Sequence, residues 1–222
     1  VPTTSGLFAG DTVTGLSEAY ADKNAGSGKT LTVNSGYVVN DGNSGGNYTV
    51  NLVSNNTGVI NKAGLTITAA TNSKTYDATT NAAAAPTTAG LFAGDTVAGL
   101  SEAYTDKNTG SGKTLTVNSG YVVNDGNGGG NYTVNLVNSN TGVINKAGLT
   151  ITAATNSKTY DATTNAAAAP TTAGLFAGDT VAGLSEDYLD KHAGFGKTLT
   201  VNSGYVVNDG NSGGNYTVNL VN

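Results

Sequence analysis

The run GKTLTVNSGYVVNDG occupies residues 112–126, and GNYTVNLV follows it at residues 130–137 after a glycine-rich turn. Leu115 and Val117 alternate with threonines in the first run, and apolar residues alternate with polar ones in the second. Successive side chains of a β-strand point to opposite faces, so this two-residue period predicts two half-buried strands. Glycine, Asn and Asp tolerate the positive φ angles of loops, so the residues between the runs predict a β-hairpin.

The first run occurs three times, in copies that begin at Gly28, Gly112 and Gly196, and the sequence between them repeats at the same 84-residue period. Such close internal repetition identifies the chain as an array of one module. The period exceeds the roughly 20 to 50 residues of solenoid repeats, so we expect separate small domains rather than a continuous superhelix. We predict an N-terminally truncated module at residues 1–62, a complete module at 63–146 and a C-terminally truncated module at 147–222.

Composition excludes several classes of protein. The chain has 222 residues, a formal net charge of −5 and no cysteine, and all ten of its basic residues are lysines. Nucleic-acid binding needs clustered Lys and Arg to neutralise phosphate, and no such cluster is present. Without cysteine there is no disulfide or thiolate metal site. No apolar run approaches the roughly 18 residues of a transmembrane helix, so we expect no membrane insertion of this segment.

The fold class that these patterns predict is all-β. Short apolar runs at Val143–Ile144, Leu149–Ile151 and Tyr160 add further strands to the hairpin, which gives seven or eight short strands in each module. Four alanines precede Pro86, but the proline and its β-branched neighbours favour an extended linker or at most one helical turn. A β-grasp-like sheet and a small two-sheet sandwich both fit this pattern.

The hairpin loop contains one aspartate in each copy: Asp41, Asp125 and Asp209. A lone aspartate among glycines and asparagines falls short of the spacing that gathers several oxygen ligands around calcium. We therefore expect each carboxylate to accept hydrogen bonds from its own turn, and we expect no metal and no other cofactor.

Four motifs occur in one order within the period: SKTYDATT, AGDTV, DKNxGxGKTLTV and GNYTV. This ordered set resembles the YDG-type repeat of filamentous-haemagglutinin-like and biofilm surface adhesins of bacteria. One departure is that alanine, at Ala78 and Ala162, replaces the glycine of Tyr-Asp-Gly. Glycine would permit a positive φ there, so alanine predicts a turn of ordinary geometry.

The resemblance implies a secreted protein of the bacterial cell surface that carries many tandem β-rich domains and no enzymatic activity. Attachment to other cells, to matrix or to a host would then be its function. Partners of such a protein are extracellular polysaccharide, host glycans or neighbouring adhesin chains. The residue pattern also favours the absence of enzymatic activity, because no nucleophile, base and orienting group recur together at a fixed spacing.

The SKTYDATT motif supplies candidate structural residues. Lysine and tyrosine two positions apart lie on one face of a strand with aspartate on the other, so we expect each tyrosine to anchor the core and the lysine stem to cover it. A Lys–Asn isopeptide crosslink is a sharper alternative for these lysines. The residues concerned are Lys74, Tyr76 and Asp77 in one copy and Lys158, Tyr160 and Asp161 in the next.

A carbohydrate-binding module is the competing hypothesis, in which Tyr20, Tyr104 or Tyr188 stacks on a sugar. His192 is the only histidine and replaces an asparagine of the other copies, so we interpret it as a solvated turn residue rather than a catalytic base. Phe195 replaces a serine near it and indicates local packing or partner contact. The Asn-Tyr-Thr sequons at the equivalents of Asn131 are interpreted as strand starts.

Overall fold

The computed structural model describes all 222 residues and contains 21 strands and no helix, which confirms the all-β prediction. No helix is therefore present that could cross a membrane. The complete second repeat has nine strands, one more than the upper end of the expected range. The alanines before Pro86 form no helical turn, in agreement with the extended linker.

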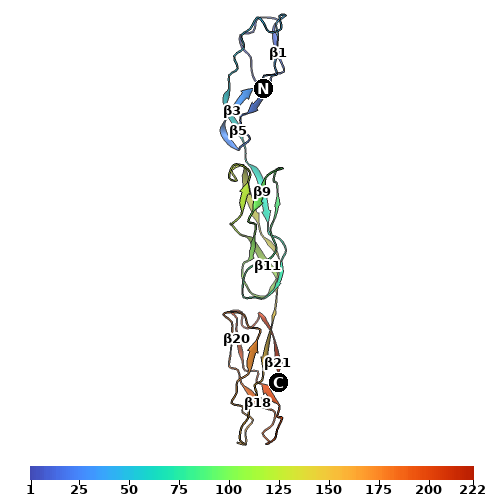
Figure 1. Ribbon diagram of the computed structural model, residues 1–222, viewed down its shortest axis with the longest axis vertical. Helices are drawn as coiled ribbons and strands as arrows, with labels where there is room; N and C mark the ends of the chain where they lie inside the picture. Colours follow the sequence, from blue (N-terminus) through green and yellow to red (C-terminus); the bar gives the residue numbers. More distant parts are fainter. The chain divides into compact units, whose positions relative to one another are not determined.

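Most strands recur at the 84-residue period, but β7 has no counterpart at residues 157–159 and β13 has none at residues 48–53 (Figure 1). The first repeat contains β1 (Thr12–Thr14), β2 (Glu18–Tyr20), β3 (Gly26–Val33), β4 (Val38–Asn40) and β5 (Asn55–Ile60). The second contains β6 (Ala63–Thr68), β7 (Ser73–Thr75), β8 (Thr87–Ala89), β9 (Thr96–Ala98), β10 (Glu102–Tyr104), β11 (Gly110–Val117), β12 (Val122–Asn124), β13 (Tyr132–Val137) and β14 (Ser139–Asn145). The third contains β15 (Ala147–Thr152), β16 (Thr171–Ala173), β17 (Thr180–Ala182), β18 (Glu186–Tyr188), β19 (Leu199–Val201), β20 (Val206–Asn208) and β21 (Tyr216–Val221).

The chain divides into two compact units whose boundary passes through the second repeat. The division therefore does not follow the repeat period, and each junction between neighbouring repeats lies inside one unit. The N-terminal unit contains residues 1–66, 88–98 and 122–135, and the C-terminal unit contains residues 67–87, 99–121 and 136–222.

A central strand organises both the second and the third repeat. In the third repeat β15 runs parallel to β21, from the pair Ala147↔Tyr216 to the pair Thr152↔Val221, and antiparallel to β16 on its other side. The second repeat has the same order, β13–β6–β8. The hairpin predicted between residues 112–126 and 130–137 is wrong, because β12 pairs with β9 and β13 pairs with β6. The glycine-rich loop between them connects strands of two different sheets, since the partners of both strands are distant in the sequence. Leu149 and Ile151 of the central strand are fully buried, as expected for a strand that is covered along its length.

A second sheet in the C-terminal unit has the order β10–β11–β14–β7. Its ladder between β11 and β14 is irregular, with register shifts on either side of Lys113. Gly142 of β14 lies where a Cβ would come within 2.8 Å of both the Lys113 carbonyl oxygen and the Tyr104 ring. Only glycine permits this close approach, which brings the Tyr104 ring over the sheet.

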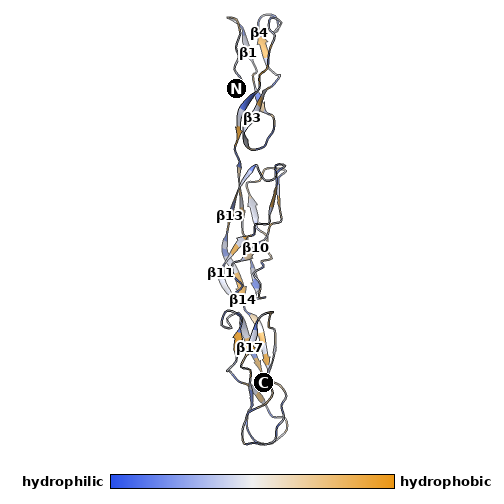
Figure 2. Ribbon diagram, turned by 90° about the vertical axis from the view of Figure 1, so that its left-hand side faces the viewer, coloured by the Kyte–Doolittle hydropathy of each residue, from blue (hydrophilic) through white to orange (hydrophobic).

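Apolar residues gather on strands such as β4 and β17, whereas the loops are largely polar (Figure 2). In the C-terminal unit one buried apolar cluster contains Tyr76 and Leu115 of the second repeat together with Leu149 and Tyr216 of the third. The expectation of separate beads is therefore wrong at this junction, because the two repeats share a core.

Candidate functional site at the junctions between repeats

Tyr76 occupies the centre of the junction between the second and third repeats. It directly follows β7, and its side chain is 1% exposed. Its hydroxyl donates a 3.0 Å hydrogen bond to Oδ2 of Asp179, and the Tyr216 hydroxyl donates a 2.6 Å bond to the same oxygen. The Tyr76 ring packs edge-on against the Phe176 and Tyr216 rings, at centroid distances of 5.9 and 5.4 Å. The second repeat thus inserts an aromatic side chain into the third.

Lys107 provides a positive charge for the buried Asp179 carboxylate. Its Nζ lies 3.6 Å from Oδ1 of Asp179 and 5.6 Å from the centroid of the Tyr76 ring. A buried carboxylate needs such partners, because its transfer out of water costs several kcal/mol when it is unpaired. Burial first, and then the hydrogen bond to Asp179, raise the pKa of Tyr216 to about 12. The Tyr216 hydroxyl therefore stays protonated and able to donate at neutral pH.

Asn215 forms a second contact across the same junction. Its side chain is fully buried and accepts a 2.9 Å hydrogen bond from the backbone N–H of Thr109, while its Nδ2 donates to Oδ1 of Asn108 at 3.2 Å. The Thr109 hydroxyl also donates to the carbonyl oxygen of Gly214 at 3.0 Å. The loop after β10 is thus tied to the glycine-rich loop between β20 and β21 of the following repeat.

The junction between the first and second repeats, in the N-terminal unit, repeats this contact. Oδ1 of Asn131 accepts a 2.8 Å hydrogen bond from the backbone N–H of Ala25, and Nδ2 of Asn131 lies 3.4 Å from Oδ1 of Asn24. These residues are 84 positions before their counterparts in the other junction. We name the pair of contacts, Asn131 to 24–25 and Asn215 to 108–109, the asparagine junction.

The aspartate of the glycine-rich loop positions the junction asparagine. Asp209 accepts hydrogen bonds from the backbone N–H groups of Asn211, Gly213 and Asn215, at 2.7 to 2.9 Å. Asp41 and Asp125 do the same in their own loops, which confirms that these carboxylates bind their own turns. Burial alone would raise the pKa of Asp209, but the three backbone donors outweigh it and hold the pKa below its ordinary value.

The sequon asparagines Asn131 and Asn215 lie at strand starts, as interpreted from the sequence, because β13 and β21 begin one residue later. Their amide groups are engaged in the asparagine junction. A glycan on either amide nitrogen would displace the neighbouring repeat, so these two side chains serve contact between repeats.

The SKTYDATT lysines do not cover the tyrosines of their own motif. Nζ of Lys74 donates to Oδ1 of Asp77 at 2.8 Å and to the Thr79 carbonyl oxygen at 2.7 Å, and it lies over the Tyr104 ring. Lys158 makes the equivalent contacts with Asp161 and the Tyr188 ring. Lys158 first, and then Thr163, lower the pKa of Asp161 to about 2. The partners of both lysine amines are carboxylates, hydroxyls and carbonyls, and no asparagine is among them.

Tyr76 and Tyr160 differ although their local sequences are identical. Tyr76 anchors the core as expected, whereas Tyr160 is 60% exposed, so the expectation that it is a core residue is wrong. Tyr76 is buried by Phe176, Asp179 and Tyr216 of the following repeat, whereas Tyr160 makes no such contact. Burial of this tyrosine is therefore a property of the junction rather than of the module.

The turn that follows each tyrosine also departs from expectation. Ala78 and Ala162 have φ angles of 62° and 64°, in the left-handed region that favours glycine. The alanine therefore retains the backbone geometry of a glycine turn, and the prediction of an ordinary turn is wrong. Such a conformation costs an alanine roughly 1–2 kcal/mol.

Two of the three tyrosines considered for sugar stacking are buried. Tyr104 is 2% exposed and donates to the Val143 carbonyl oxygen, and Tyr188 is 9% exposed under Lys158. Neither ring has a free face for a sugar. Tyr20 is 42% exposed, and its hydroxyl donates to the Val59 carbonyl oxygen.

His192 lies in an exposed turn, where its backbone N–H donates to Oδ1 of Asp190. Phe195 is fully exposed, so it is not locally packed. It remains a candidate for contact with a partner.

Comparison with known proteins identifies the repeats. The sequence model of the YDG domain matches residues 61–142 and again residues 145–222. The chain belongs to the YDG domain family. Its two tandem YDG copies cover well over half of the sequence, and both junctions described above involve them. No curated protein and no solved structure matches the chain.

The residues of the YDG junctions could not be singled out from the sequence. Asp179 and Asn215 have identical counterparts in every copy, but so do most other residues. Identity between copies therefore does not distinguish junction residues from the rest of the module. One signal was available. Five of the six differences between residues 63–138 and 147–222 fall within positions 103–111 and their counterparts, the segment that holds the junction loop.

Proposed function

We propose that this chain is part of the repeat region of a secreted bacterial surface adhesin. In this proposal the YDG copies extend the protein from the cell and contribute to cell–cell, matrix or host attachment. The observation that carries the proposal is the shared core at the junction, where Tyr76 is buried by Asp179 and Tyr216 of the next copy. When each repeat packs against the next, the length of the array is set by the number of repeats, as a spacer requires.

The connection between repeats supports the same reading. A single residue, Lys146, separates the end of β14 from the start of β15. A flexible linker would allow neighbouring domains to move freely, whereas one residue between two paired strands leaves little freedom. The asparagine junction adds polar contacts of defined geometry to this short connection.

The proposed partners are extracellular polysaccharide, host glycans or neighbouring adhesin chains. The formal net charge of −5 disfavours nucleic acid. A carbohydrate-binding role for the tyrosines is not favoured, because Tyr104 and Tyr188 are buried. We therefore assign the YDG copies a structural role, with attachment made through surfaces other than these rings.

Two measurements test the proposal. Small-angle X-ray scattering on arrays of two, three and four repeats should show a maximum dimension that grows by a constant increment with each added repeat. Antibodies against residues 61–142 should label intact cells of the source bacterium, and external protease should remove the label. A maximum dimension that grows only with the cube root of mass, or labelling that requires lysis, would contradict the spacer and the surface location respectively.

A further inference from the structure

Asn127 and Gly128 form the only Asn-Gly pair in the chain. They lie in the glycine-rich loop of the second repeat, and residues 121–137 are otherwise identical to their counterparts in the other repeats, where serine follows the asparagine. An asparagine side chain can cyclise onto the backbone nitrogen of the next residue. Glycine presents that nitrogen without the steric hindrance of a side chain. The three loops therefore differ at the one residue that controls this reaction.

The backbone of the loop leaves the reacting nitrogen free. The Asp125 carboxylate accepts hydrogen bonds from three backbone N–H groups, those of Asn127, Gly129 and Asn131. The N–H of Gly130 donates to the Asn127 carbonyl oxygen at 3.0 Å. Of residues 127–131, only Gly128 has a backbone N–H without an acceptor. No hydrogen bond therefore has to break before this nitrogen can react.

The side-chain amide of Asn127 lies over its own turn. A Cβ at Gly130 would come within 2.7 Å of Nδ2 and 3.2 Å of Cγ of Asn127, so the side chain folds back closely over the loop. Gly128 is exposed and has open space beside its Cα. The electrophilic carbon thus lies near the backbone of the turn, and water has access to the pair.

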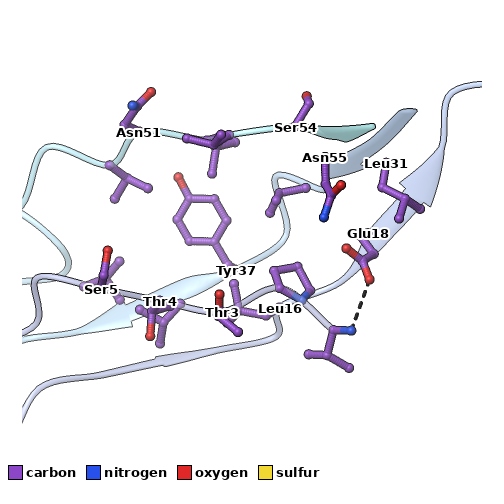
Figure 3. A pocket seen from close by; sticks show the side chains of 18 of the residues that line it. Thr3, Thr4, Ser5, Leu16, Glu18, Leu31, Tyr37, Asn51, Ser54 and Asn55 are labelled. Carbon is purple, nitrogen blue, oxygen red and sulfur yellow. Dashed lines mark hydrogen bonds and ion pairs between the residues drawn. The ribbon is translucent and has the colours of Figure 1, made fainter. Parts of the chain in front are cut away.

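Other exposed asparagines lack a following glycine. Asn51 and Asn55, for example, line a groove in the first repeat and are both exposed (Figure 3). Leu52 and Asn56 follow them, and each carries a side chain that hinders attack by its backbone nitrogen. Exposure alone therefore does not distinguish Asn127, whereas the glycine after it does.

We propose that Asn127 is a site of spontaneous deamidation that weakens the asparagine junction between the first and second repeats. The backbone nitrogen of Gly128 gives up its proton and attacks Cγ of Asn127. A C–N bond closes a succinimide ring, and the amino group of Nδ2 leaves with that proton as ammonia. Water then adds to either carbonyl of the ring and opens it, which yields aspartate or isoaspartate. The reaction consumes only water and needs no oxidant or cofactor.

The product disturbs the contact between the two repeats. Nδ2 of Asn127 donates to Oδ1 of Asn131 at 3.1 Å, and the same Oδ1 accepts the backbone N–H of Ala25 at 2.8 Å. Aspartate replaces the donor by a carboxylate oxygen that repels Oδ1 of Asn131, and isoaspartate also lengthens the backbone of the loop. Asn131 then loses its position and its contact with Ala25 weakens. All of these residues belong to the N-terminal unit.

The experiment ages the 222-residue chain in mildly alkaline buffer and follows its tryptic peptides by mass spectrometry. Cleavage after lysine places the three loops in peptides 30–62, 114–146 and 198–222. Each deamidation adds about 1 Da. Fragment ions should assign this gain to Asn127, at a rate at least several-fold above the rates at Asn43 and Asn211.

Gly128→Ser is the matched variant for the reaction. Ser44 and Ser212 have φ angles of 54° and 53° at the equivalent positions, close to the 60° of Gly128, so the loop accepts serine without a change of backbone. The substitution should lower the rate at Asn127 to that of the other two loops.

Hydrogen exchange followed by NMR measures the effect on the junction. The Ala25 amide should exchange several-fold faster in the aged chain and in the Asn127→Asp variant than in the fresh chain. Asn43→Asp is the control, because Asn43 donates to Asn47 in the same way but does not lie at this contact, and it should leave Ala25 unchanged. The proposal is overturned if Asn127 reacts no faster than Asn43 and Asn211, if Gly128→Ser reacts as fast as the original chain, or if Ala25 exchanges at the same rate after conversion.

Discussion

Replacing Ala162 by glycine should stabilise the protein. Ala162 is exposed and has a φ of 64°, a conformation that costs alanine roughly 1–2 kcal/mol and glycine almost nothing. Glycine also makes the unfolded chain more flexible, which costs about 0.4–1 kcal/mol. The difference leaves a net gain of about 0.5–1 kcal/mol in the free energy of unfolding.

Ala78 provides an internal comparison at the same place in the second repeat. Its φ is 62°, but its methyl group is half-buried and packs against the core, so glycine also loses up to about 0.8 kcal/mol of burial there. Ala78→Gly should therefore have an effect near zero. Ala98 lies in strand β9 with an ordinary φ, and Ala98→Gly should destabilise by roughly 0.5–1 kcal/mol.

The assay is urea unfolding monitored by circular dichroism, with thermal melts beside it. A gain of 0.5–1 kcal/mol corresponds to a rise in Tm of about 1–4 °C for a chain of this size. The reasoning is refuted if Ala162→Gly lowers the free energy of unfolding while Ala98→Gly behaves as expected. That result would mean that the positive φ carries no strain at this turn.

Three further predictions concern the junction. Asn215→Ala should lower the free energy of unfolding by roughly 2–3 kcal/mol, because it leaves buried hydrogen-bonding groups unpaired. Asn47→Ala, at the exposed counterpart, should lower it by less than about 0.5 kcal/mol. Urea titrations of both variants measure the two effects, and equal effects would contradict the prediction. Tyr216 has a raised pKa of about 12, so its hydroxyl contributes fully to the free energy of unfolding below pH 10, and this contribution is lost as pH rises from 10 to 12. Urea unfolding at a series of alkaline pH values should show this loss. A Tyr216→Phe variant with the same pH profile as the original chain would refute the prediction. Asp209 has a lowered pKa, so its carboxylate contributes to the free energy of unfolding above about pH 4, and this contribution is lost as pH falls through the folded-state pKa. The stability of Asp209→Asn should therefore depend less on pH in acid titrations than that of the original chain. An identical acid transition in both proteins would contradict the prediction.

Local patterns predicted where several strands and the aspartate-stabilised loop lie, but not which strands pair: the expected hairpin is wrong because β12 pairs with β9 and β13 with β6. The alternation around Leu115 and Val117 placed β11, and the glycine-rich loop around Asp209 predicted the turn that this carboxylate stabilises. Both follow from interactions within a few residues. Pairing between β15 and β21 joins residues almost 70 positions apart, and no local pattern specifies which distant segment covers a strand.

The contacts at the junction could not be predicted from the sequence either, because they too join residues that are far apart in the chain. Tyr76 and Tyr160 have the same neighbours in the sequence, yet one is buried and the other exposed, because their environments are set by the following repeat. The positive φ of Ala162 was missed because residue preference indicates the commonest backbone geometry, whereas the surrounding hydrogen bonds of Asp161 and Thr163 hold the turn in a rarer one.

The most direct test of the coupling between repeats is hydrogen exchange of the whole chain with Tyr76 intact and with Tyr76→Ala. Tyr76 belongs to the second repeat, but its partners Asp179 and Tyr216 belong to the third. Coupled repeats predict that the substitution lowers amide protection in β21 of the third repeat as well as around β7 of the second. Loss of protection confined to the residues around β7, with β21 unchanged, would contradict the shared core and with it the proposed spacer.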